Sequence, residues 1–194
     1  FSLQQAIHTR QFWMLGAIFF CFLFGVETIM VHIVPHATEL AISATTAANI
    51  LAVIGWLNIA GMIIMGSAGD RVGNRLAMIV CFVLLSVALL WLQVAKELWM
   101  LYLFALIYGF AHGGFFALIA PRKARMAQFS EQGVIFGIII FSGTIGGAVG
   151  PFLAGHIFDV SGNYQLVLLF CAAVSAIGLI LSLFLKSTTV KVLS

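Results

Sequence analysis

The chain has 194 residues, of which 63% are hydrophobic and only 8% charged, and its formal net charge at pH 7 is +3. A soluble domain carries roughly 25% charged residues, so this composition leaves too little charge to wet the surface of a globule and excludes a soluble fold. The basic residues lie in short segments between apolar runs rather than in a solvent-facing stripe, so the positive charge does not indicate nucleic-acid binding. We therefore predict a membrane protein whose surface is mostly solvated by lipid.

Six apolar runs follow one another, and each is long enough to cross a bilayer as a helix, which needs about 20 residues. Strands are excluded by this length and because a segment in lipid must satisfy its own backbone hydrogen bonds. We predict an all-α, polytopic bundle over residues 12–186, with a cytoplasmic amphipathic lead-in at 1–11 and a cytoplasmic tail at 187–194. The six predicted spans are Phe12–Val34, Ile42–Met65, Leu76–Ala95, Leu98–Pro121, Val134–Phe158 and Tyr164–Leu185.

The lysines and arginines predict the orientation of these spans. Eight of them fall on one side of the predicted bundle and only Lys96 on the other. Because cytoplasmic loops carry the excess of Lys and Arg, we expect both ends of the chain to face the cytoplasm, in the plasma membrane. The eight are Arg10, Arg71, Arg75, Arg122, Lys123, Arg125, Lys186 and Lys191.

The first span contains Glu27, the only acid well inside any predicted span. A charge at mid-membrane costs at least about 2.5–3.5 kcal/mol on insertion scales, so it requires a reason. Glu27 is the best candidate for a proton-coupling carboxyl or a substrate contact. The alternative is a neutral Glu that hydrogen-bonds a neighbouring helix. His32 and His36 lie near the outer end, where we expect them to be solvated.

Four further polar residues are candidates for a substrate or proton path with Glu27. Asn49, in the second span, is predicted at the depth of Glu27, and Asn58 at the depth of His112 in the fourth span. Tyr108 lies one turn before His112, and a His can carry a proton or donate to an anion near neutral pH. Alternatively, His112 only bonds a carbonyl within the bundle.

Between the second and third spans the chain reads GSAGDRVGNR, which fits G-x-x-x-D-R-x-G-x-R. This resembles the loop motif of the major facilitator superfamily of secondary transporters, where it joins the second and third helices of each six-helix half. The resemblance implies a cytoplasmic gate, in which the glycines turn the chain and Asp70 meets the positive N-terminal end of the helix that begins near Ser130. The alternative is an ordinary positive-inside loop. The matching residues are Gly66, Asp70, Arg71, Gly73 and Arg75.

The fifth span is rich in glycines at small-xxx-small spacing, which lets helix backbones approach closely. Pro151 removes one backbone hydrogen bond and can kink the helix. The pattern favours tight packing, and a bendable helix also suits a sliding contact between bundles. The candidate packing and kink positions are Gly133, Gly137, Gly143, Gly146, Gly147, Gly150, Pro151 and Gly155.

The stretch from Gly146 to Tyr164, GGAVGPFLAGHIFDVSGNY, resembles the eleventh helix of monocarboxylate-porter-like members of the superfamily. This implies that the six spans are the C-terminal half of a twelve-helix carrier whose N-terminal half belongs to the same polypeptide. One departure concerns charge. Animal monocarboxylate carriers place an Asp and an Arg where this chain has Asn58 and Met62, and the Lys in helix eleven of oxalate–formate exchangers has no counterpart. Either the other half supplies the charge partner for a carboxylate, or the substrate is not a monocarboxylate.

Together these features predict secondary active transport of a small solute, such as an organic anion of the monocarboxylate kind, by rocker-switch alternating access. We expect proton coupling, because Glu27 and His112 can titrate and nothing resembles a sodium cage. The alternative is a non-transporting membrane sensor or partner subunit. The sequence has no catalytic constellation, so we expect no enzyme, and neither a metal site nor a cofactor is predicted.

Overall fold

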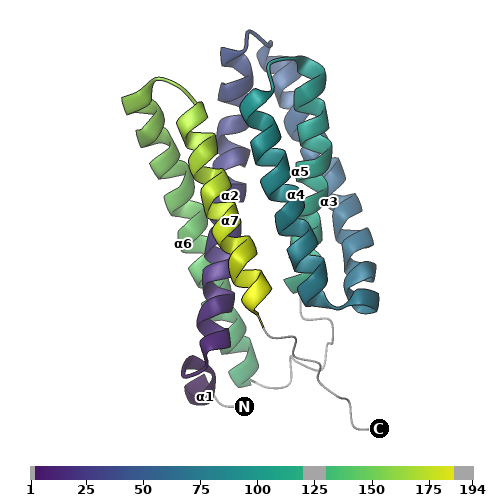
Figure 1. The fold of residues 1–194 in the computed structure, drawn as a ribbon, viewed down its shortest axis with the longest axis vertical. Helices are drawn as coiled ribbons and strands as arrows, with labels where there is room; N and C mark the ends of the chain where they lie inside the picture. The colour runs from purple at the N-terminus through teal and green to yellow at the C-terminus, as the bar shows by residue number, and fades with distance from the viewer. Residues whose placement is uncertain (1–2, 120–129, 186–194) are drawn as a thin grey trace.

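The computed structural model describes residues 3–119 and 130–185 (Figure 1). A short helix, α1, precedes six long ones, each apolar and long enough to cross a membrane. The predicted all-α fold of a polytopic membrane protein is therefore confirmed. The helices are α1 (Leu3–Ile7), α2 (Arg10–Glu39), α3 (Ala44–Val72), α4 (Asn74–Val94), α5 (Leu98–Ile119), α6 (Ser130–Ser161) and α7 (Gln165–Phe184).

Several helices continue past the apolar runs that predict them. The first long helix, α2, runs through Pro35 to Glu39, and α3 runs through the whole first part of the glycine motif to Val72. The predicted turn at Gly66 is therefore wrong, since Gly66 lies inside α3. The break between α3 and α4 is Gly73 alone, whose φ of +91° is open to glycine but costly for other residues.

The helices alternate in direction, so the start of α2, the α3–α4 turn and the end of α7 lie together at one end of the bundle (Figure 1). We call this the Gly73 end and the opposite one the Glu39 end. In Figure 1, α6 and α3 form the two flanks, with α4 and α7 in front. Only 22% of the most apolar window is buried in α3 and in α6, against 56% in α2 and 61% in α5. The flanking helices therefore offer long uncovered faces, with Trp56 of α3 and Phe152 of α6 about three-quarters exposed.

Helices α3 and α5 form one of two close helix pairs in the bundle. A Cβ atom on Gly113 would overlap the carbonyl oxygen of Asn58, and one on Gly109 would lie 2.6 Å from the carbonyl oxygen of Ile54. The backbones thus touch because these positions have no side chain.

The other close pair is α2 with α6, two parallel helices. Gly143, Gly146, Gly147 and Gly150 of α6 all face α2, and a Cβ on Gly150 would lie 2.5 Å from the carbonyl oxygen of Phe24. The remaining glycines proposed for packing have open space where a Cβ would be, so they do not serve close contact within this bundle; they are Gly133, Gly137 and Gly155.

The α3–α5 contact yields a stability prediction. Replacing Gly113 with Ala should destabilise the protein by about 1–3 kcal/mol, because the new methyl group meets backbone that cannot move aside. Gly55→Ala, on the same pair of helices but with open space at its Cβ position, is the matched control and should be neutral or slightly stabilising. Thermal unfolding of the full-length protein in detergent measures both. Equal melting temperatures for the two variants would contradict the contact.

Candidate functional site

Glu27 lies in the middle part of α2, against α6. Its Cγ atom is 3.0 Å from the point where a Cβ of Gly147 would sit, so the side chain lies directly on bare α6 backbone. The residue is half-buried and makes no hydrogen bond or ion pair with any other residue in the described ranges. Within those ranges, no other Asp, Glu, Lys or Arg lies more than two turns from the end of a long helix. Glu27 is therefore an isolated carboxyl at mid-span.

Tyr108 fixes α5 to α2 at this depth. Its side chain is 1% exposed, and its Oη donates a hydrogen bond of 3.0 Å to the carbonyl oxygen of Val26. Glu27, the next residue, lies close enough to interact electrostatically with the phenol. The sequence predicts Tyr108 in a solute or proton path, whereas in this structure it is enclosed and anchors the turn that carries Glu27.

His112 lies one turn further along α5, within a cluster of aromatic rings. Its ring centroid is 6.0 Å from that of Phe22 and 5.4 Å from that of Phe116. The residue is 8% exposed, and its Nδ1 atom is buried with no hydrogen-bond partner among the described residues. His112 therefore belongs to the packed contact between α2 and α5 and does not line an open cavity here.

The two asparagines of α3 lie at different depths. Asn58 is half-buried, and its carbonyl meets Gly113, so it lies beside His112 on α5. Asn49 is exposed near the start of α3. Counted from the Glu39 end at 1.5 Å per residue, Asn49 lies about 10 Å further out than Glu27. The predicted equal depth of these two residues is therefore wrong, because α2 continues five residues past its apolar run to Glu39 whereas α3 begins only at Ala44.

At the Gly73 end, the first residues of α4 fasten two other helices. Asn74 donates from Nδ2 to the carbonyl oxygen of Leu118 at 3.2 Å, and Arg75 donates from Nη2 to the carbonyl oxygen of Leu183. These carbonyls belong to the last turns of α5 and α7, where no helical N–H can reach them and where the helix dipole favours a cation. Arg75 therefore braces this bundle.

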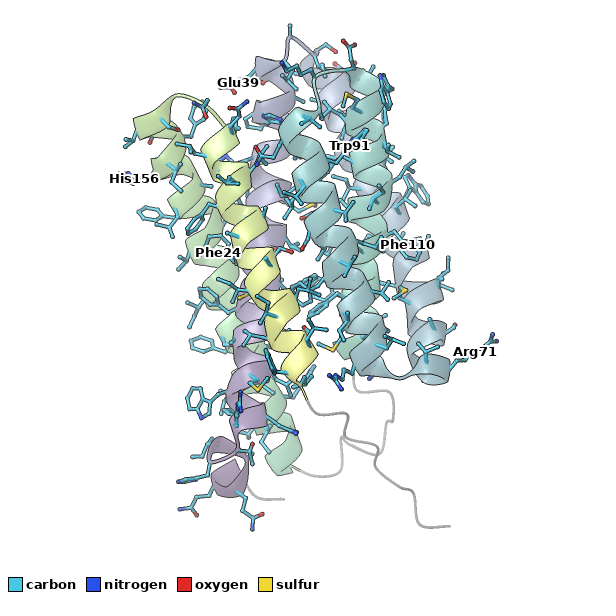
Figure 2. The ribbon with its side chains drawn as sticks, viewed as in Figure 1. Phe24, Glu39, Arg71, Trp91, Phe110 and His156 are labelled. Atoms are coloured by element: carbon cyan, nitrogen blue, oxygen red, sulfur yellow. The ribbon has the colours of Figure 1, made fainter. Side chains whose placement is uncertain are left out.

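The other charged residues of the motif face outward. Asp70 and Arg71 are exposed, and Arg71 extends away from the end of α3 (Figure 2). The contact between Asp70 and the start of α6 stays a prediction; the two helices α3 and α6 form opposite flanks of this bundle (Figure 1). Five basic residues of the orientation argument lie outside the described residues: Arg122, Lys123, Arg125, Lys186 and Lys191.

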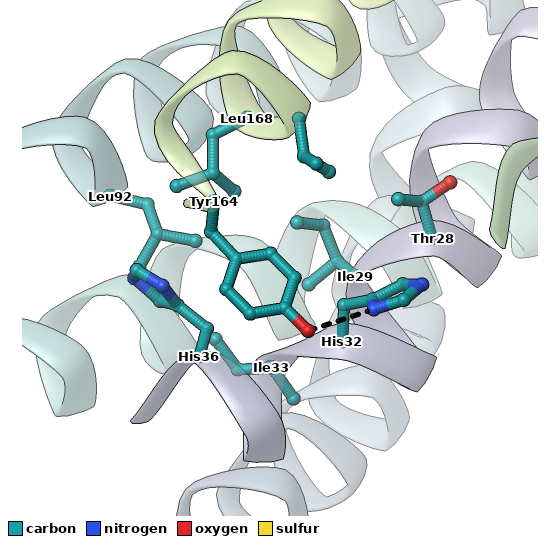
Figure 3. Close-up of a pocket in the computed structure, with 9 residues that line it drawn as sticks. Thr28, Ile29, His32, Ile33, His36, Leu92, Tyr164 and Leu168 are labelled. Atoms are coloured by element: carbon teal, nitrogen blue, oxygen red, sulfur yellow. Dashed lines mark hydrogen bonds between the residues drawn. The ribbon is translucent and has the colours of Figure 1, made fainter. Parts of the chain in front are cut away.

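Towards the Glu39 end, His32 of α2 joins two parts of the chain that are distant in sequence (Figure 3). Its Nε2 lies 3.2 Å from the carbonyl oxygen of Pro151, and its Nδ1 lies 3.2 Å from Oη of Tyr164. Because a carbonyl only accepts, Nε2 carries the hydrogen and Nδ1 of the neutral ring accepts from the phenol. His32 thus holds both α6 and the start of α7.

Tyr164 is the centre of this cluster: its ring stacks on that of Phe158, with centroids 4.4 Å apart, and is nearly perpendicular to that of His36, with centroids 5.4 Å apart. Burial, together with the acids Glu39 and Asp159, raises the pKa of Tyr164 above its ordinary value, so its hydroxyl stays protonated. A small pocket of about 10 Å³ adjoins the cluster. Both ring nitrogens of His36 are buried. The expectation that His32 and His36 are solvated is therefore wrong.

Sequence reasoning missed two groups, each with a weak local signal. Asn74 occupies a variable place of the motif, but an Asn directly after the glycine that ends a helix can reach neighbouring backbone. Tyr164 is the last residue of the stretch GGAVGPFLAGHIFDVSGNY and directly precedes α7, while its partner His32 lies 132 residues away, and nothing in the sequence indicates their pairing.

This fold and its few polar groups define a polytopic, all-α membrane protein with helices packed through bare backbone and one isolated carboxyl inside. Residues 15–193 match the Major Facilitator Superfamily, and the chain belongs to that family. The resemblance to its monocarboxylate-porter-like members is also confirmed by the relatives that follow.

The chain is 27% identical over 168 residues to monocarboxylate transporter 12 of Rattus norvegicus, covering 84% of this chain and 34% of that protein. It is 30% identical over 139 residues to monocarboxylate transporter 13 of the same species, covering 69% and 32%. A POT family transporter, solved in complex with 5-aminolevulinic acid, shares the fold with a TM-score of 0.77 at 22% identity, over 91% of this chain and 38% of that one. The chain thus spans about a third of the length of these relatives.

The two arginines of the glycine motif differ in their contacts, since Arg75 bonds the end of α7 whereas Arg71 is exposed. Arg75→Ala should lower the stability of the protein by about 1 kcal/mol, because it removes a charge-assisted hydrogen bond to the end of α7. Arg71→Ala, which removes an equal charge from an exposed position, is the control and should leave the melting temperature unchanged. Thermal unfolding in detergent measures the stability of both variants. A lower stability of Arg71→Ala alone, or an equal loss in both variants, would contradict the role of Arg75 in holding the bundle together.

Proposed function

We propose that this chain forms the C-terminal six-helix half of a secondary active transporter, which moves a small solute by alternating access. The family membership supports this, as do relatives about three times as long as the matched segment. The uncovered apolar faces of α3 and α6 offer the surface for an N-terminal six-helix half of the same polypeptide. The solute path would then lie between the halves near the bilayer midplane, as in other carriers built from repeats.

The observation that carries the proposal is the isolated carboxyl of Glu27. A carboxylate inside the membrane is costly unless it is paired or protonated, and no described residue of this bundle pairs with it. The partner of this carboxyl therefore either binds and leaves during the transport cycle or belongs to the other half. A proton fits this best, because it needs no further ligand from the bundle. We propose that Glu27 takes up the coupled proton.

For the solute, we propose an organic anion of the monocarboxylate class. The support is the similarity to monocarboxylate transporters 12 and 13. The places that hold Asp and Arg in animal carriers of this type are Asn58 and Met62 here, and the described spans contain no Lys or Arg away from helix ends. The cation that pairs with the solute carboxylate is therefore assigned to the other half. An unprotonated Glu27 would repel such a solute, so protonation would permit its binding.

For the gate, we propose that Asp70 and Arg71 face the other half at the cytoplasmic side and hold the two halves together when that side is closed. Both are exposed at the end of a flanking helix. Arg75 stays with its own bundle, because it is already engaged by α7. We propose that the protein lies in the plasma membrane, and the distribution of Lys and Arg supports both ends of this segment in the cytoplasm.

Glu27→Gln should uncouple uptake from a pH gradient, since an amide cannot titrate. The measurement is uptake of radiolabelled acetate, L-lactate and pyruvate by the full-length protein in proteoliposomes, with and without an inward proton gradient. The variant should retain exchange of the accepted solute but lose accumulation. Normal gradient-driven accumulation would remove Glu27 from the proposal, and a wild-type protein that takes up none of the three would remove the anion assignment.

Asp70→Asn should increase the accessibility of the cytoplasmic side and lower uptake, because the latch loses its charge. Labelling of an engineered cysteine in the cytoplasmic half of the path reports the accessibility. Glu97→Gln, an equal charge change in the exposed turn between α4 and α5, serves as control and should change neither. If Asp70→Asn also changes neither, the latch is excluded and a non-transporting membrane protein becomes the better account.

A further inference from the structure

We propose that the backbone carbonyl of Gly147 is the hydrogen-bond acceptor for the protonated carboxyl of Glu27, and that Pro151 keeps this carbonyl available. The inference rests on the proposed function, in which Glu27 carries the coupled proton. It adds the group that holds this proton and names the helix that responds to it.

The first step concerns the hydrogen-bond ladder of α6. This helix runs without interruption from Ser130 to Ser161, with Pro151 inside it. Proline has no N–H, so it cannot donate to the carbonyl four residues earlier, which is that of Gly147. In lipid, a carbonyl freed in this way must find another donor, and neighbouring helices commonly supply it.

The second step concerns distance. Gly147 faces α2, and the nearest atom to its missing side chain is Cγ of Glu27, at 3.0 Å. Since Gly147 has no Cβ, no side chain of its own keeps Glu27 away from the backbone at the point where the ladder is broken.

The third step is that these two helices already exchange such bonds. Ser142 of α6 donates from Oγ to the carbonyl oxygen of Gly16 on α2 at 2.9 Å. Towards the Glu39 end, His32 of α2 reaches the carbonyl oxygen of Pro151 on α6 at 3.2 Å. The helices are parallel, so the carbonyl of Gly147, one turn before that of Pro151, lies about one turn before His32 on α2. That is the level of Glu27.

The fourth step is the chemistry of the carboxyl. An ionised carboxylate is an acceptor only and cannot bond a carbonyl, whereas a protonated one has a single O–H donor. The bond therefore forms when Glu27 takes a proton from water and breaks when the proton returns to water, with no other bond changed. It selectively favours the protonated form. The sequence allowed Glu27 to be either a proton-coupling carboxyl or a neutral Glu that hydrogen-bonds a neighbouring helix. In this proposal both describe the same hydrogen bond, which forms when the proton binds and breaks when it leaves.

Few other titratable groups lie near this carboxyl. Among the described residues, the helices packed around α2 bring no Asp, Glu, Lys or Arg to this level. Asp159 of α6 lies in the last turn of that helix, near the Glu39 end. The nearby titratable side chains are His32 of α2, Tyr108 and His112 of α5, and Cys171 of α7. Tyr108 already donates to Val26 and His32 to Pro151, so neither takes the proposed place.

The experiment is an infrared pH titration of the full-length protein in lipid, which needs no solute. The C=O stretch of protonated Glu27 is identified as the band that disappears in Glu27→Gln. Pro151→Ala restores an N–H that competes for the Gly147 carbonyl. We expect its Glu27 band to shift to higher frequency and its titration to require about threefold to tenfold more protons, the value of one net hydrogen bond.

Pro35→Ala is the matched control, because it makes the same chemical change in α2, in the last part of the helix and away from Glu27. It should leave both band and midpoint unchanged. A wild-type midpoint and frequency in Pro151→Ala would overturn the inference and leave Glu27 as the proton carrier. If instead no titrating band in the wild-type protein is lost in Glu27→Gln, Glu27 carries no exchangeable proton, and the proposed function falls with the inference.

Should Pro151→Ala fail to fold, Gly147→Ala tests the same bond, because its methyl group would press on Cγ of Glu27 and move the carboxyl off the carbonyl. Gly155→Ala, on the same helix with open space around its Cβ position, is its control. The shift is expected only in Gly147→Ala. An unshifted midpoint in both variants overturns the proposal.

Discussion

The contact between bare helix backbones is the constraint on which the rest of this structure depends. Apolar side chains gain little by leaving lipid for one another, so helices in a membrane associate through close packing and hydrogen bonds. Here the carbonyls of α2 meet the glycines of α6, and the carbonyl of Asn58 meets Gly113 of α5. These two contacts set the depth of the polar groups. They lay Glu27 on the backbone of α6 and bring Asn58 beside His112.

Many of the polar side chains find backbone carbonyls as partners. Tyr108 bonds Val26 in the middle of the bundle, Asn74 bonds the end of α5, and His32 bonds Pro151. Such bonds satisfy donors without placing a second charge in an apolar interior. In the glycine motif, these bonds distinguish two groups of residues. The residues after Gly73 hold their own bundle together, while Asp70 and Arg71 remain directed outward.

The fold class followed from the sequence because lipid permits few alternatives to a helix for a long apolar run, and Glu27 stood out because charge is rare there. Other features were beyond reach. In a span that is apolar on every face, hydropathy does not show which face meets a neighbour, so the enclosure of His112 and the open surroundings of Gly155 needed the packed structure. The depth of Glu27 relative to Asn49 was misjudged because helical hydrogen bonding in α2 continues past its apolar run. The bond between His32 and Tyr164 joins residues 132 positions apart.

The pairing of α2 with α6 has a consequence for how the protein is made. Three other long helices, α3, α4 and α5, lie between these partners in the chain. During synthesis α2 enters the membrane well before α6 has been made, so Glu27 at first lacks the backbone that later contacts it. This acidic residue therefore raises the free energy of inserting α2. The early bundle has to shelter it, or the translocation machinery has to retain α2 until its late-arriving partner emerges.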